Sequence, residues 1–401
     1  MTEQQNTPDL RFSNFLDMWH IHKLSDVATI TGGGTPSTKV SEYWDGEIDW
    51  YTPNEIGERI YARGSKKKIT NLGYKKSSTK LLPINTILFT SRAGIGNTAI
   101  LAKEGCTNQG FQSIIPNSEK IDSYFIYTIS NHIKKYALKH AAGSTFLEIS
   151  GKELGKMKLF LPSLKEQQKI GVFFSKLDRQ IELEEEKLEL LEQQKKGYMQ
   201  KIFSQELRFQ DENEGDYPNW KKITIKEVAN LTAGKSKKNE NKGKYIIMDM
   251  GTVTKNGTML THKSTPYESD LLNKGDLVMP KDDIGGGHII GKTVFIPESH
   301  KYVLGDHVYR LEIKNCNSLF LHYYINSDIV NRSLKRKVTG SAQLGLNRKS
   351  VEEEVIKTPC LEEQEKIGNF FNKIDNLIEL QTNKIESLKQ RKKGLLQKMF
   401  V

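Results

Sequence analysis

The sequence contains one long segment twice, and this repeat decides the fold. Residues 162–203 read PSLKEQQKIGVFFSKLDRQIELEEEKLELLEQQKKGYMQKIF, and residues 359–400 read PCLEEQEKIGNFFNKIDNLIELQTNKIESLKQRKKGLLQKMF. The offset between them is 197 residues, and 24 of the 42 aligned pairs are identical without a gap. Because this identity is far above chance, the segment is a duplicated element, and the chain consists of two related halves.

Apolar residues recur in both copies at alternating steps of four and three, which is the spacing of a heptad seam. Polar residues interrupt the seam at the same two places in each copy. Two matching seams in one chain favour an intramolecular helix pair over a dimer of chains, with the polar positions fixing the register. The apolar seam residues are Phe174, Leu177, Ile181, Leu188, Leu191, Phe371, Ile374, Ile378, Ile385 and Leu388, and the polar ones are Glu184, Lys195, Gln381 and Lys392.

The first copy carries a helix start signal. Pro162 precedes Ser163-x-x-Glu166, a capping box in which serine and glutamate satisfy free backbone N–H groups. We predict a helix from about residue 164 to residue 203, roughly 60 Å long at 1.5 Å per residue. Cys360 replaces the serine in the second copy, so we expect that helix to be less well capped.

A globular unit precedes each helix, and the two units are weakly related. Residues 85–100 and residues 275–296 each read as an apolar strand, a Gly-rich polar loop and a second apolar run. Short β-branched runs broken by Gly, Pro and Asn indicate mixed α/β units whose strand order the sequence leaves open. The predicted plan is a first unit (1–161), a helix (162–205), an exposed acidic linker (206–219), a second unit (220–358) and a second helix (359–401).

Composition excludes several classes of protein. The 401 residues are 36% hydrophobic and 27% charged, with a mean hydropathy of −0.56. The sequence shows neither a signal peptide nor an apolar run long enough to span a bilayer, so we expect no membrane partner. Cys106, Cys316 and Cys360 lie far apart and outside CxxC pairs, which argues against a disulfide framework and a thiolate metal site. We expect a reduced, cytoplasmic protein.

The positive charge is concentrated in the two globular units. The net charge is +11, of which residues 1–161 carry +5 and residues 220–358 carry +8, whereas the two helices are nearly neutral. Lysine and arginine runs occur in both units. A basic protein of this kind favours an anionic partner, most often nucleic acid.

One motif has a catalytic form. Gly286–Thr293 satisfies the phosphate-loop pattern GxxxxGK[ST]. Such a loop requires a following helix, whereas the β-like run Val294–Pro297 follows here, so we interpret the segment as a hairpin loop. His20 and His22 lack the partners of a metal site, and the sequence contains no HExxH, GxSxG or Asn-Pro-Pro-aromatic motif. The sequence therefore indicates a binding protein rather than an enzyme.

Several further motifs carry a family resemblance. Leu164-x-Glu166-Gln167-x-x-Ile170 and Leu361-x-Glu363-Gln364-x-x-Ile367 open the two helices. The first unit has the turn Gly33–Ser37 with Tyr43-Trp44 and Trp50–Pro53, and the element Asn108–Phe111. From about Trp19 to Phe400 the chain resembles the specificity subunit of a type I restriction–modification system. The second unit lacks the turn and the Asn-Gln-Gly-Phe element, which weakens the transfer of residue roles there.

The resemblance implies an α+β fold in which two target recognition domains sit at opposite ends of an antiparallel helix pair that acts as a spacer. Each domain would read one half of a split double-stranded DNA target. Two methyltransferase subunits carrying S-adenosylmethionine would dock, and separate restriction (motor–nuclease) subunits would bind ATP with magnesium and cut. The chain itself would hold no cofactor or metal and catalyse nothing.

Loop position and side-chain chemistry select candidate DNA contacts. Lysine and arginine can bind guanine or phosphate, and the sequence does not separate these roles. The serines could equally cap turns, and the histidine could be a solvated bystander. Two other functions stay open, a coiled-coil scaffold with non-specific DNA binding and a nucleotide enzyme built on the phosphate-loop pattern. The candidate contacts are Lys66, Ser91, Arg92, Asn97, Ser144, Lys238, Lys281, His288, Arg336 and Ser341.

Overall fold

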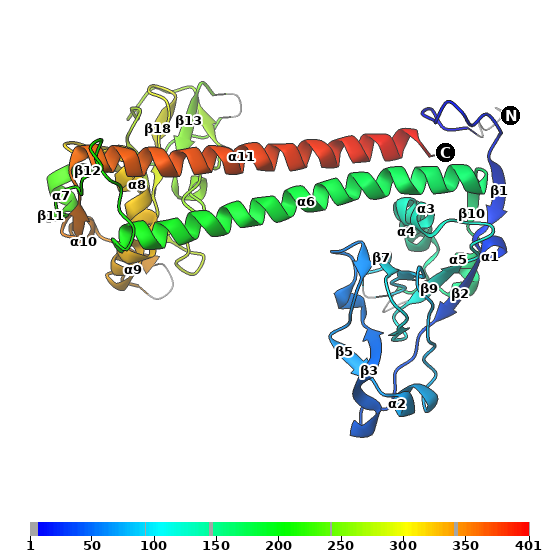
Figure 1. Cartoon of the computed structure of the whole chain (residues 1–401). Coiled ribbons are helices and arrows are strands. Elements are labelled where there is room, and N and C mark those ends of the chain that lie inside the picture. Colours follow the sequence, from blue (N-terminus) through cyan, green and yellow to red (C-terminus); the bar gives the residue numbers. More distant parts are fainter. Residues whose placement is uncertain (1–6, 93, 144–146, 241–242, 341–343, 401) are drawn as a thin grey trace. The chain divides into compact units, whose positions relative to one another are not determined.

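The chain forms two compact units in the computed structural model, which describes residues 7–92, 94–143, 147–240, 243–340 and 344–400. Unit 1 comprises residues 1–184 and 384–401, and unit 2 comprises residues 185–383. Both long helices contribute to both units, because each unit boundary falls inside a helix (Figure 1). No helix among the described residues is long and apolar enough to cross a membrane.

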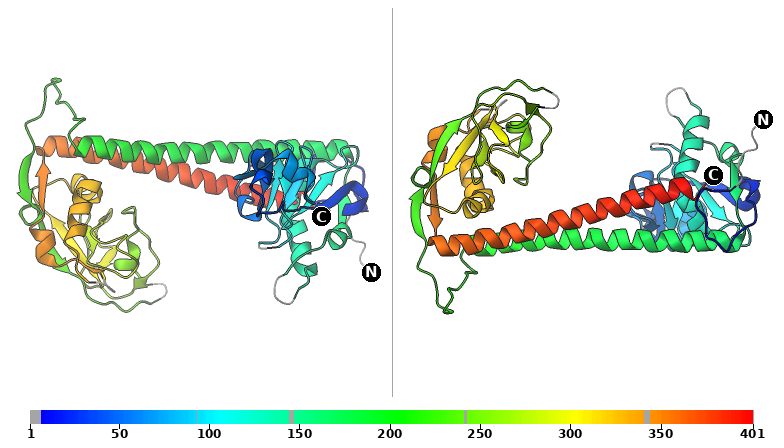
Figure 2. Two further views of the ribbon diagram at one scale, coloured as in Figure 1. Left: turned by 90° about the horizontal axis from the view of Figure 1, so that it is seen from below. Right: turned by 90° about the horizontal axis from the view of Figure 1, so that it is seen from above.

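The two long helices are α6 (Leu164–Phe203) and α11 (Leu361–Lys398), and α6 has the bounds that the sequence predicts. In unit 1 the beginning of α6 lies beside the end of α11, where Asp178 pairs with Lys392. In unit 2 the end of α6 lies beside the beginning of α11, where the rings of Phe203 and Phe371 stack with centroids 5.6 Å apart. The helices are therefore antiparallel and intramolecular, as predicted, and Figure 2 shows them from two further sides.

The seam residues lie at the helix interface, as the heptad spacing predicts. Phe174, Ile181, Phe371 and Ile385 are buried. The other apolar seam residues are partly buried because the helix pair has solvent on its remaining faces. These residues are Leu177, Leu188, Leu191, Ile374, Ile378 and Leu388.

Unit 1 contains two sheets. The larger sheet has the order β2-β9-β6-β7-β4 and the smaller one β5-β3-β8, both with antiparallel and parallel pairs. A separate strand pair, β1 with β10, leads directly into α6. The strands are β1 (His20–Lys23), β2 (Ala28–Gly32), β3 (Trp44–Tyr51), β4 (Tyr61–Ala62), β5 (Lys67–Ile69), β6 (Ile87–Phe89), β7 (Thr98–Leu101), β8 (Cys106–Thr107), β9 (Gln112–Pro116) and β10 (Lys158–Leu161).

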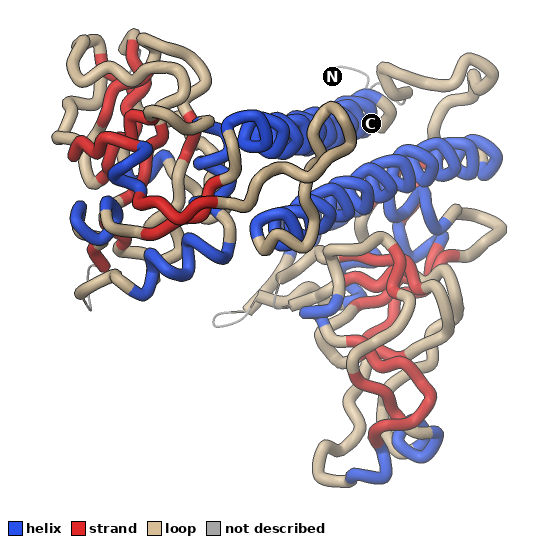
Figure 3. The backbone as a smooth tube through the Cα atoms, turned by 60° about the vertical axis from the view of Figure 1, so that its left-hand side comes forward, coloured by secondary structure: helices blue, strands red, loops and turns tan. Residues whose placement is uncertain are grey.

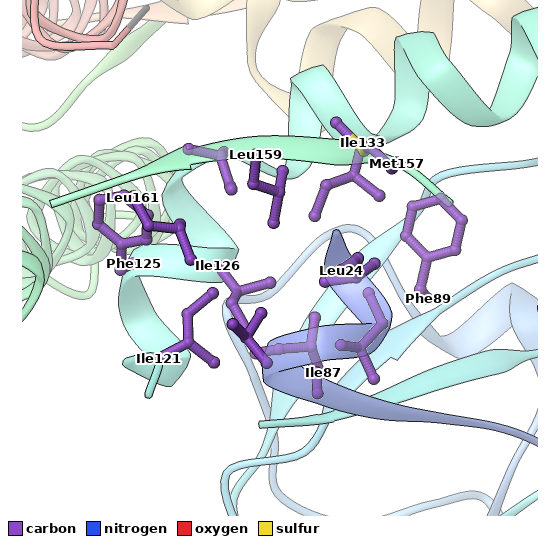
Figure 4. Packing of buried hydrophobic residues seen from close by; sticks show 14 of the residues in the cluster. Leu24, Ile87, Phe89, Ile121, Phe125, Ile126, Ile133, Met157, Leu159 and Leu161 are labelled. Atoms are coloured by element: carbon purple, nitrogen blue, oxygen red, sulfur yellow. The ribbon is translucent and has the colours of Figure 1, made fainter. Parts of the chain in front are cut away.

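Short helices accompany these sheets, and one apolar core joins them to the long helices. Leu24, Ile87, Phe125 and Leu161 come from four different elements and point toward one another (Figure 4). The same core includes Phe174 of α6. The helices are α1 (Leu24–Val27), η1 (Ser41–Tyr43), η2 (Pro53–Glu55), α2 (Asn71–Lys75), α3 (Ser123–Thr128), α4 (Ser130–His140) and α5 (Gly151–Gly155).

Unit 2 repeats this combination of short strands and helices at the long helices (Figure 3). Its sheets differ and have the orders β12-β19-β15-β17 and β14-β13-β18. Its strand pair β11–β21 leads into α11, as β1–β10 leads into α6. The strands are β11 (Lys221–Thr224), β12 (Ala229–Ala233), β13 (Tyr245–Met248), β14 (Ser264–Thr265), β15 (Leu277–Pro280), β16 (Asp282–Asp283), β17 (Val294–Phe295), β18 (Tyr302–Leu304), β19 (Val308–Ile313), β20 (Leu344–Gly345) and β21 (Val355–Thr358).

The core of unit 2 also includes both long helices. Phe203 of α6 and Phe371 of α11 pack with Trp220 and Phe320 in one apolar cluster. Each globular part thus shares its core with the helix pair. The remaining helices of this unit are α7 (Ile225–Val228), η3 (Met250–Thr252), α8 (Ser318–Asn326), α9 (Asp328–Arg336) and α10 (Arg348–Glu352).

One local prediction is corrected, and the mostly exposed segment 206–219 also makes contacts that the sequence did not predict. The backbone N–H of Glu166 donates to Ser163 Oγ at 3.4 Å, but the Glu166 carboxylate binds Arg11 instead of completing a capping box. The segment 206–219, predicted as an exposed linker, contacts α11: Phe209 packs edge-on against Phe370, and the buried Tyr217 donates a hydrogen bond to Glu362 at 2.7 Å.

Candidate nucleic-acid interface

The Gly-rich loops predicted from the sequence follow the middle strands of the two larger sheets. In unit 1, β6 leads into a loop that returns as β7, and the N–H of Thr90 donates to the Asn97 carbonyl at 3.0 Å to close it. In unit 2, β15 leads into a longer loop that returns as β17. Both loops connect antiparallel strands, so they are hairpin loops.

A second hairpin lies against each of these loops. Its base is closed by the bridge Ala142–Glu148 in unit 1 and by the bridge Thr339–Gly345 in unit 2. Each hairpin is hydrogen-bonded to the neighbouring loop, through Ile149 N–H to Ser91 O at 3.1 Å and through Leu346 N–H to Lys281 O at 2.7 Å. The candidates Ser144 and Ser341 fall between the bridged residues in the sequence and lie outside the described residues.

Among the unit 1 candidates, the structure brings together Ser91, Arg92 and Asn97 in one loop. Arg92 and Asn97 are partly exposed, so solvent reaches both side chains. Ser91 is fully buried, and its hydroxyl donates to Glu148 at 3.4 Å. This burial argues against direct contact between the Ser91 side chain and DNA, because the hydroxyl supports the neighbouring hairpin.

The family motifs of the first unit meet beside this loop. The indole N–H of Trp50 donates to the Gly34 carbonyl at 2.9 Å, and the hydroxyl of Thr35 donates to the Gln109 side chain. The N–H of Ser91 donates to the carbonyl of Gly110 at 2.8 Å. The Gly-Gly-Thr-Pro turn and the Asn-Gln-Gly-Phe element thus hold the base of the loop that presents Arg92.

The unit 2 loop is held by a buried carboxylate. Asp283 accepts hydrogen bonds from the N–H groups of Gly285 and Ile289, at 2.6 and 2.9 Å. This leaves the candidate His288 exposed near the tip of the loop, while Lys281 at its base is partly buried. Asp282, beside Lys281, binds His307 Nδ1 at 2.7 Å, a contact that the sequence did not predict.

The remaining candidates lie on other elements. Arg336 is exposed at the end of α9, shortly before the hairpin that contains Ser341. Lys66 is exposed before β5 of the smaller sheet, and Lys238 is exposed in the loop after β12, where it pairs with Glu240 at 2.7 Å. Among the described residues, no hydrogen bond or ion pair joins the Lys66 or Lys238 side chain to the hairpin loops.

The phosphate-loop pattern does not form a phosphate site. Thr293 leads into β17 rather than into a helix, and the amine of Lys292 donates to the Asn326 carbonyl at 2.8 Å. Burial, and then the charge of Lys335, lowers the pKa of Lys292 to about 8. Burial also lowers the pKa of the neighbouring His322 to about 3. Lys292 therefore serves the packing of unit 2, as the hairpin interpretation predicts.

The matching position in unit 1 borders a cavity. Gly96-Asn97-Thr98 corresponds to Gly291-Lys292-Thr293 in the sequence, so the short asparagine stands where unit 2 has the long lysine. The cavity has a volume of about 260 Å³, and Asn97, Thr98, Lys134 and Lys392 are among its lining residues. Lys134 is a basic side chain near the candidate loop that sequence reasoning missed.

Sequence reasoning also missed two ion pairs that anchor the helix starts. Both carboxylate oxygens of Glu166 accept from Arg11 at 2.7 Å, and both of Glu363 accept from Arg208 at 3.2 and 2.7 Å. The two glutamates are buried. The signal was available, because Leu-Arg-Phe occurs at residues 10–12 and again at residues 207–209, the same 197-residue offset.

The glutamines that follow these glutamates explain the second part of the family motif. Gln167 accepts from the Asp122 N–H at 3.0 Å and donates to the Pro162 carbonyl at 3.0 Å. Gln364 accepts from the Asn317 N–H at 2.8 Å and donates to the Pro359 carbonyl at 2.9 Å. Each glutamine fastens the start of a short helix, α3 in unit 1 and α8 in unit 2, to the start of a long helix.

The chemistry of the site is that of a binding surface. Within the ranges that the structure describes, no three His, Cys, Asp or Glu side chains form a group suited to a metal ion. The exposed groups on the candidate loops are arginine, asparagine, lysine and histidine side chains. These groups can donate hydrogen bonds to phosphates and to base edges.

Comparison with known families gives two matches along the chain. The family described as type I restriction modification DNA specificity domain matches residues 17–193 and again residues 217–390. Each match includes one globular part and most of the long helix that follows it.

Individual relatives agree with this result. The MjaIX type I restriction enzyme specificity subunit of Methanocaldococcus jannaschii is 40% identical over 177 residues, which are 43% of this chain and 41% of that protein. The MjaVIII specificity subunit of the same organism is 22% identical over 98% of this chain and 95% of its own length. The crystal structure of a type I restriction–modification S subunit from M. genitalium has the same fold, with a TM-score of 0.66 at 17% identity over 98% of this chain and 99% of that one.

Proposed function

This chain belongs to the family of type I restriction–modification DNA specificity subunits, and we propose that it reads a bipartite DNA target, one half with each unit. It is a DNA-recognition subunit rather than a catalytic one. The observation that carries the proposal is the duplication: two related units, each with a hairpin-loop cluster and a net positive charge, are built on one helix pair.

The two units are expected to read different half-sites. Phosphate contacts supply affinity without sequence information, and side chains on loops that reach base edges supply specificity. The framework around the long helices is the same in both units, whereas the loops differ in length and in their polar residues. We assign base or phosphate contact to Arg92 and Asn97 in unit 1, and to Lys281, His288 and Arg336 in unit 2.

Competition binding tests the proposal. The purified chain should bind one bipartite duplex at least about 10³-fold more tightly than random duplex at the same salt concentration. Equal affinity for both would support the alternative of a scaffold with non-specific DNA binding, and would refute sequence reading. Mapping methylated sites in the source genome, with and without this gene, would supply the target duplex.

A single substitution distinguishes reading from anchoring. Arg92→Ala should cost about 1–3 kcal/mol and relax the preference at one base position if Arg92 reads a base. A uniform loss over all sequences, with a smaller dependence on salt, would make Arg92 a phosphate contact instead. Ser91→Ala is the matched control, because its buried side chain should leave the base preference unchanged.

We further propose that two methyltransferase subunits dock on the helices, with the restriction subunits joining the complex in the cytoplasm. S-adenosylmethionine and ATP with magnesium would then bind to those partners and not to this chain. Exposed leucines on α11, Leu377 and Leu380, support such docking. Leu377→Glu with Leu380→Glu should reduce methyltransferase co-purification, whereas Leu260→Glu, at an exposed leucine of a recognition-domain loop, should not.

A further inference from the structure

Three helices meet at one carboxylate in each unit, which is buried in unit 1 and partly buried in unit 2. In unit 1, Asp178 of α6 binds Lys392 of α11 at 2.5 Å and accepts a hydrogen bond from the hydroxyl of Tyr124 of α3 at 2.9 Å. The Asp178 and Tyr124 side chains are both more than nine-tenths buried. One carboxylate therefore connects both long helices to the recognition domain.

Unit 2 contains the same arrangement with the helices exchanged. Asp375 of α11 binds Lys195 of α6 at 2.5 Å and accepts from the hydroxyl of Tyr323 of α8 at 2.8 Å. The Lys195 amine also lies 5.3 Å from the centre of the Tyr323 ring. Asp178 and Asp375, like Lys195 and Lys392, are separated by the 197 residues of the repeat.

The tyrosines, in contrast, are not equivalent positions. Gly171 packs against Tyr124, and its counterpart Gly368 packs against Leu319, so Leu319 occupies the place of Tyr124 in unit 2. Tyr323 lies one helical turn beyond Leu319. Each recognition domain thus supplies a tyrosine hydroxyl to the equivalent aspartate of its own unit. The two tyrosines come from different turns of the corresponding helix, and the surrounding sequence differs.

The recurrence of these contacts in both units suggests that the ion pairs orient the recognition domains on the helix pair rather than stabilise the fold. Buried ion pairs contribute little net stability, because the cost of removing two charges from water offsets their attraction. They do restrict orientation, because a buried charge tolerates few arrangements of its partners. In both units the constraint acts at the joint between the recognition domain and the helix pair.

We propose that Asp178 with Tyr124 and Lys392, and Asp375 with Tyr323 and Lys195, form two polar clamps that position each recognition domain on the helix pair and so make the chain selective for the separation between its two DNA half-sites. This inference rests on the proposed bipartite reading. The clamp residues are positioning residues: they touch neither bases nor phosphates, and they act by fixing where the reading loops lie.

The test compares spacer lengths in DNA selected by the full-length chain. A library of duplexes carrying both half-sites, separated by random spacers of varied length, is offered to the wild type and to the double variant Tyr124→Phe/Tyr323→Phe. The wild type should select one spacer length. In the double variant, which loses one hydrogen bond in each clamp, the preference for that length over its neighbours should fall by up to about 25-fold, about fivefold for each hydrogen bond, while affinity for a single half-site stays within about twofold.

Lys384→Ala is the matched control. The Lys384–Glu184 ion pair joins the same two helices and is not part of either clamp, so its loss should leave the spacer preference unchanged. A folded double variant with wild-type spacer preference would refute the proposal that the clamps set the spacer preference. A wild type that ignores the second half-site would instead overturn the bipartite reading on which they rest.

Circular dichroism of the double variant shows whether a changed spacer preference comes from misfolding or from lost positioning in a folded protein. If the double variant does not fold, the single variants Tyr124→Phe and Tyr323→Phe, each with one clamp intact, are compared with the wild type in the same selection. Each should broaden the spacer preference to an intermediate degree. Single variants that also fail to fold would show that the hydroxyls are required for the fold itself, and would overturn the positioning role.

Discussion

Units 1 and 2 agree where they meet the long helices and differ where they present loops to solvent. The arginine–glutamate pairs, the glutamine bridges and the carboxylate clamps occur in both units with nearly the same distances. The hairpin loops differ: Asn97 borders a cavity, whereas Lys292 at the corresponding position in unit 2 donates a hydrogen bond to the Asn326 carbonyl. Repetition therefore preserves the attachment of each domain, while the surfaces that would read DNA have diverged.

The largest effect is expected where the two units agree most closely. Glu166→Ala leaves the Arg11 guanidinium largely buried and without its partner, and Glu363→Ala does the same to Arg208. Removing one member of a buried pair costs about 3–5 kcal/mol, so each variant should lose that much unfolding free energy. Urea unfolding followed by circular dichroism measures it.

The surface pair Arg179–Glu182 on the same helix supplies the control. Both side chains are more than half exposed, so Glu182→Ala should change the unfolding free energy by less than about 1 kcal/mol. Equal costs for Glu166→Ala and Glu182→Ala would contradict the anchoring role. A large difference between Glu166→Ala and Glu363→Ala would show that the two attachments are not energetically equivalent.

Glycines in the long helices allow a second comparison within the repeat. A Cβ on Gly171 would lie 2.6 Å from Asp122 Oδ1, and one on Gly368 would lie 2.9 Å from the Phe320 nitrogen. Alanine at either place forces the recognition domain away from the helix. We expect each variant to lose about 1–3 kcal/mol of stability, measured by thermal unfolding.

Gly197 and Gly394 are the matched controls, since they form the next glycine pair of the repeat. A Cβ at either position meets nothing within 4 Å. Alanine there should stabilise the helix by up to about 1 kcal/mol, because alanine has the higher helix propensity. The sign of the change should therefore differ between the two glycine pairs, and a stabilising Gly171→Ala or Gly368→Ala would refute the close packing.

The helix pair could be predicted because its signals are local and repeated. The seam from Phe174 to Leu191 has a fixed period, and period determines which face of a helix is buried. The strand order could not be predicted, because β2 pairs with β9 and β4 pairs with β7 through contacts between residues far apart in the chain. Short strands carry little pattern of their own, so tertiary packing determines their partners.

For the candidate DNA interface, the sequence predicted the hairpin loops but not which of their side chains are exposed. Arg92 and His288 lie on the expected hairpins, because an apolar run, a glycine-rich stretch and a second apolar run specify a strand, a turn and a strand. Ser91 was chosen for the same reason and is buried, since sequence does not tell which way the first residue of a loop points. The clamps were missed because Asp178 and Asp375 lie next to the seam rather than in it.

The smallest expected effect tests the difference between Asn97 and Lys292. The charged form of Lys292 is disfavoured in the folded state, where its pKa is about 8 instead of the ordinary 10.5. Between these two values the unfolded chain binds one more proton, so the contribution of this group to stability rises with pH over that window. Below about pH 8 the folded protein carries the full cost of the buried charge.

Lys292→Met should therefore stabilise the protein at pH 7 by about 1 kcal/mol, the low end for replacing a buried ion, because the amine has a hydrogen bond to lose. Its advantage should shrink between pH 8 and pH 10.5, where wild-type Lys292 is already neutral in the folded state. Urea unfolding of the wild type and the variant at pH 7 and pH 10 measures the gain in unfolding free energy and its decrease with pH. The charged groups that act on Lys292 are Lys335, Asp328 and Lys195.

Asn97→Met is the corresponding change in unit 1 and should show no such pH dependence, because asparagine does not titrate. If both variants respond to pH alike, the response comes from elsewhere in the chain, and Lys292 is not the buried cation that distinguishes the loops. If only the effect of Lys292→Met on the unfolding free energy depends on pH, the corresponding hairpin positions differ. One holds a destabilising buried charge in unit 2, and the other borders a polar cavity in unit 1. The loops can then diverge in charge while the helix attachments stay fixed, which is what two readers of different half-sites on one framework require.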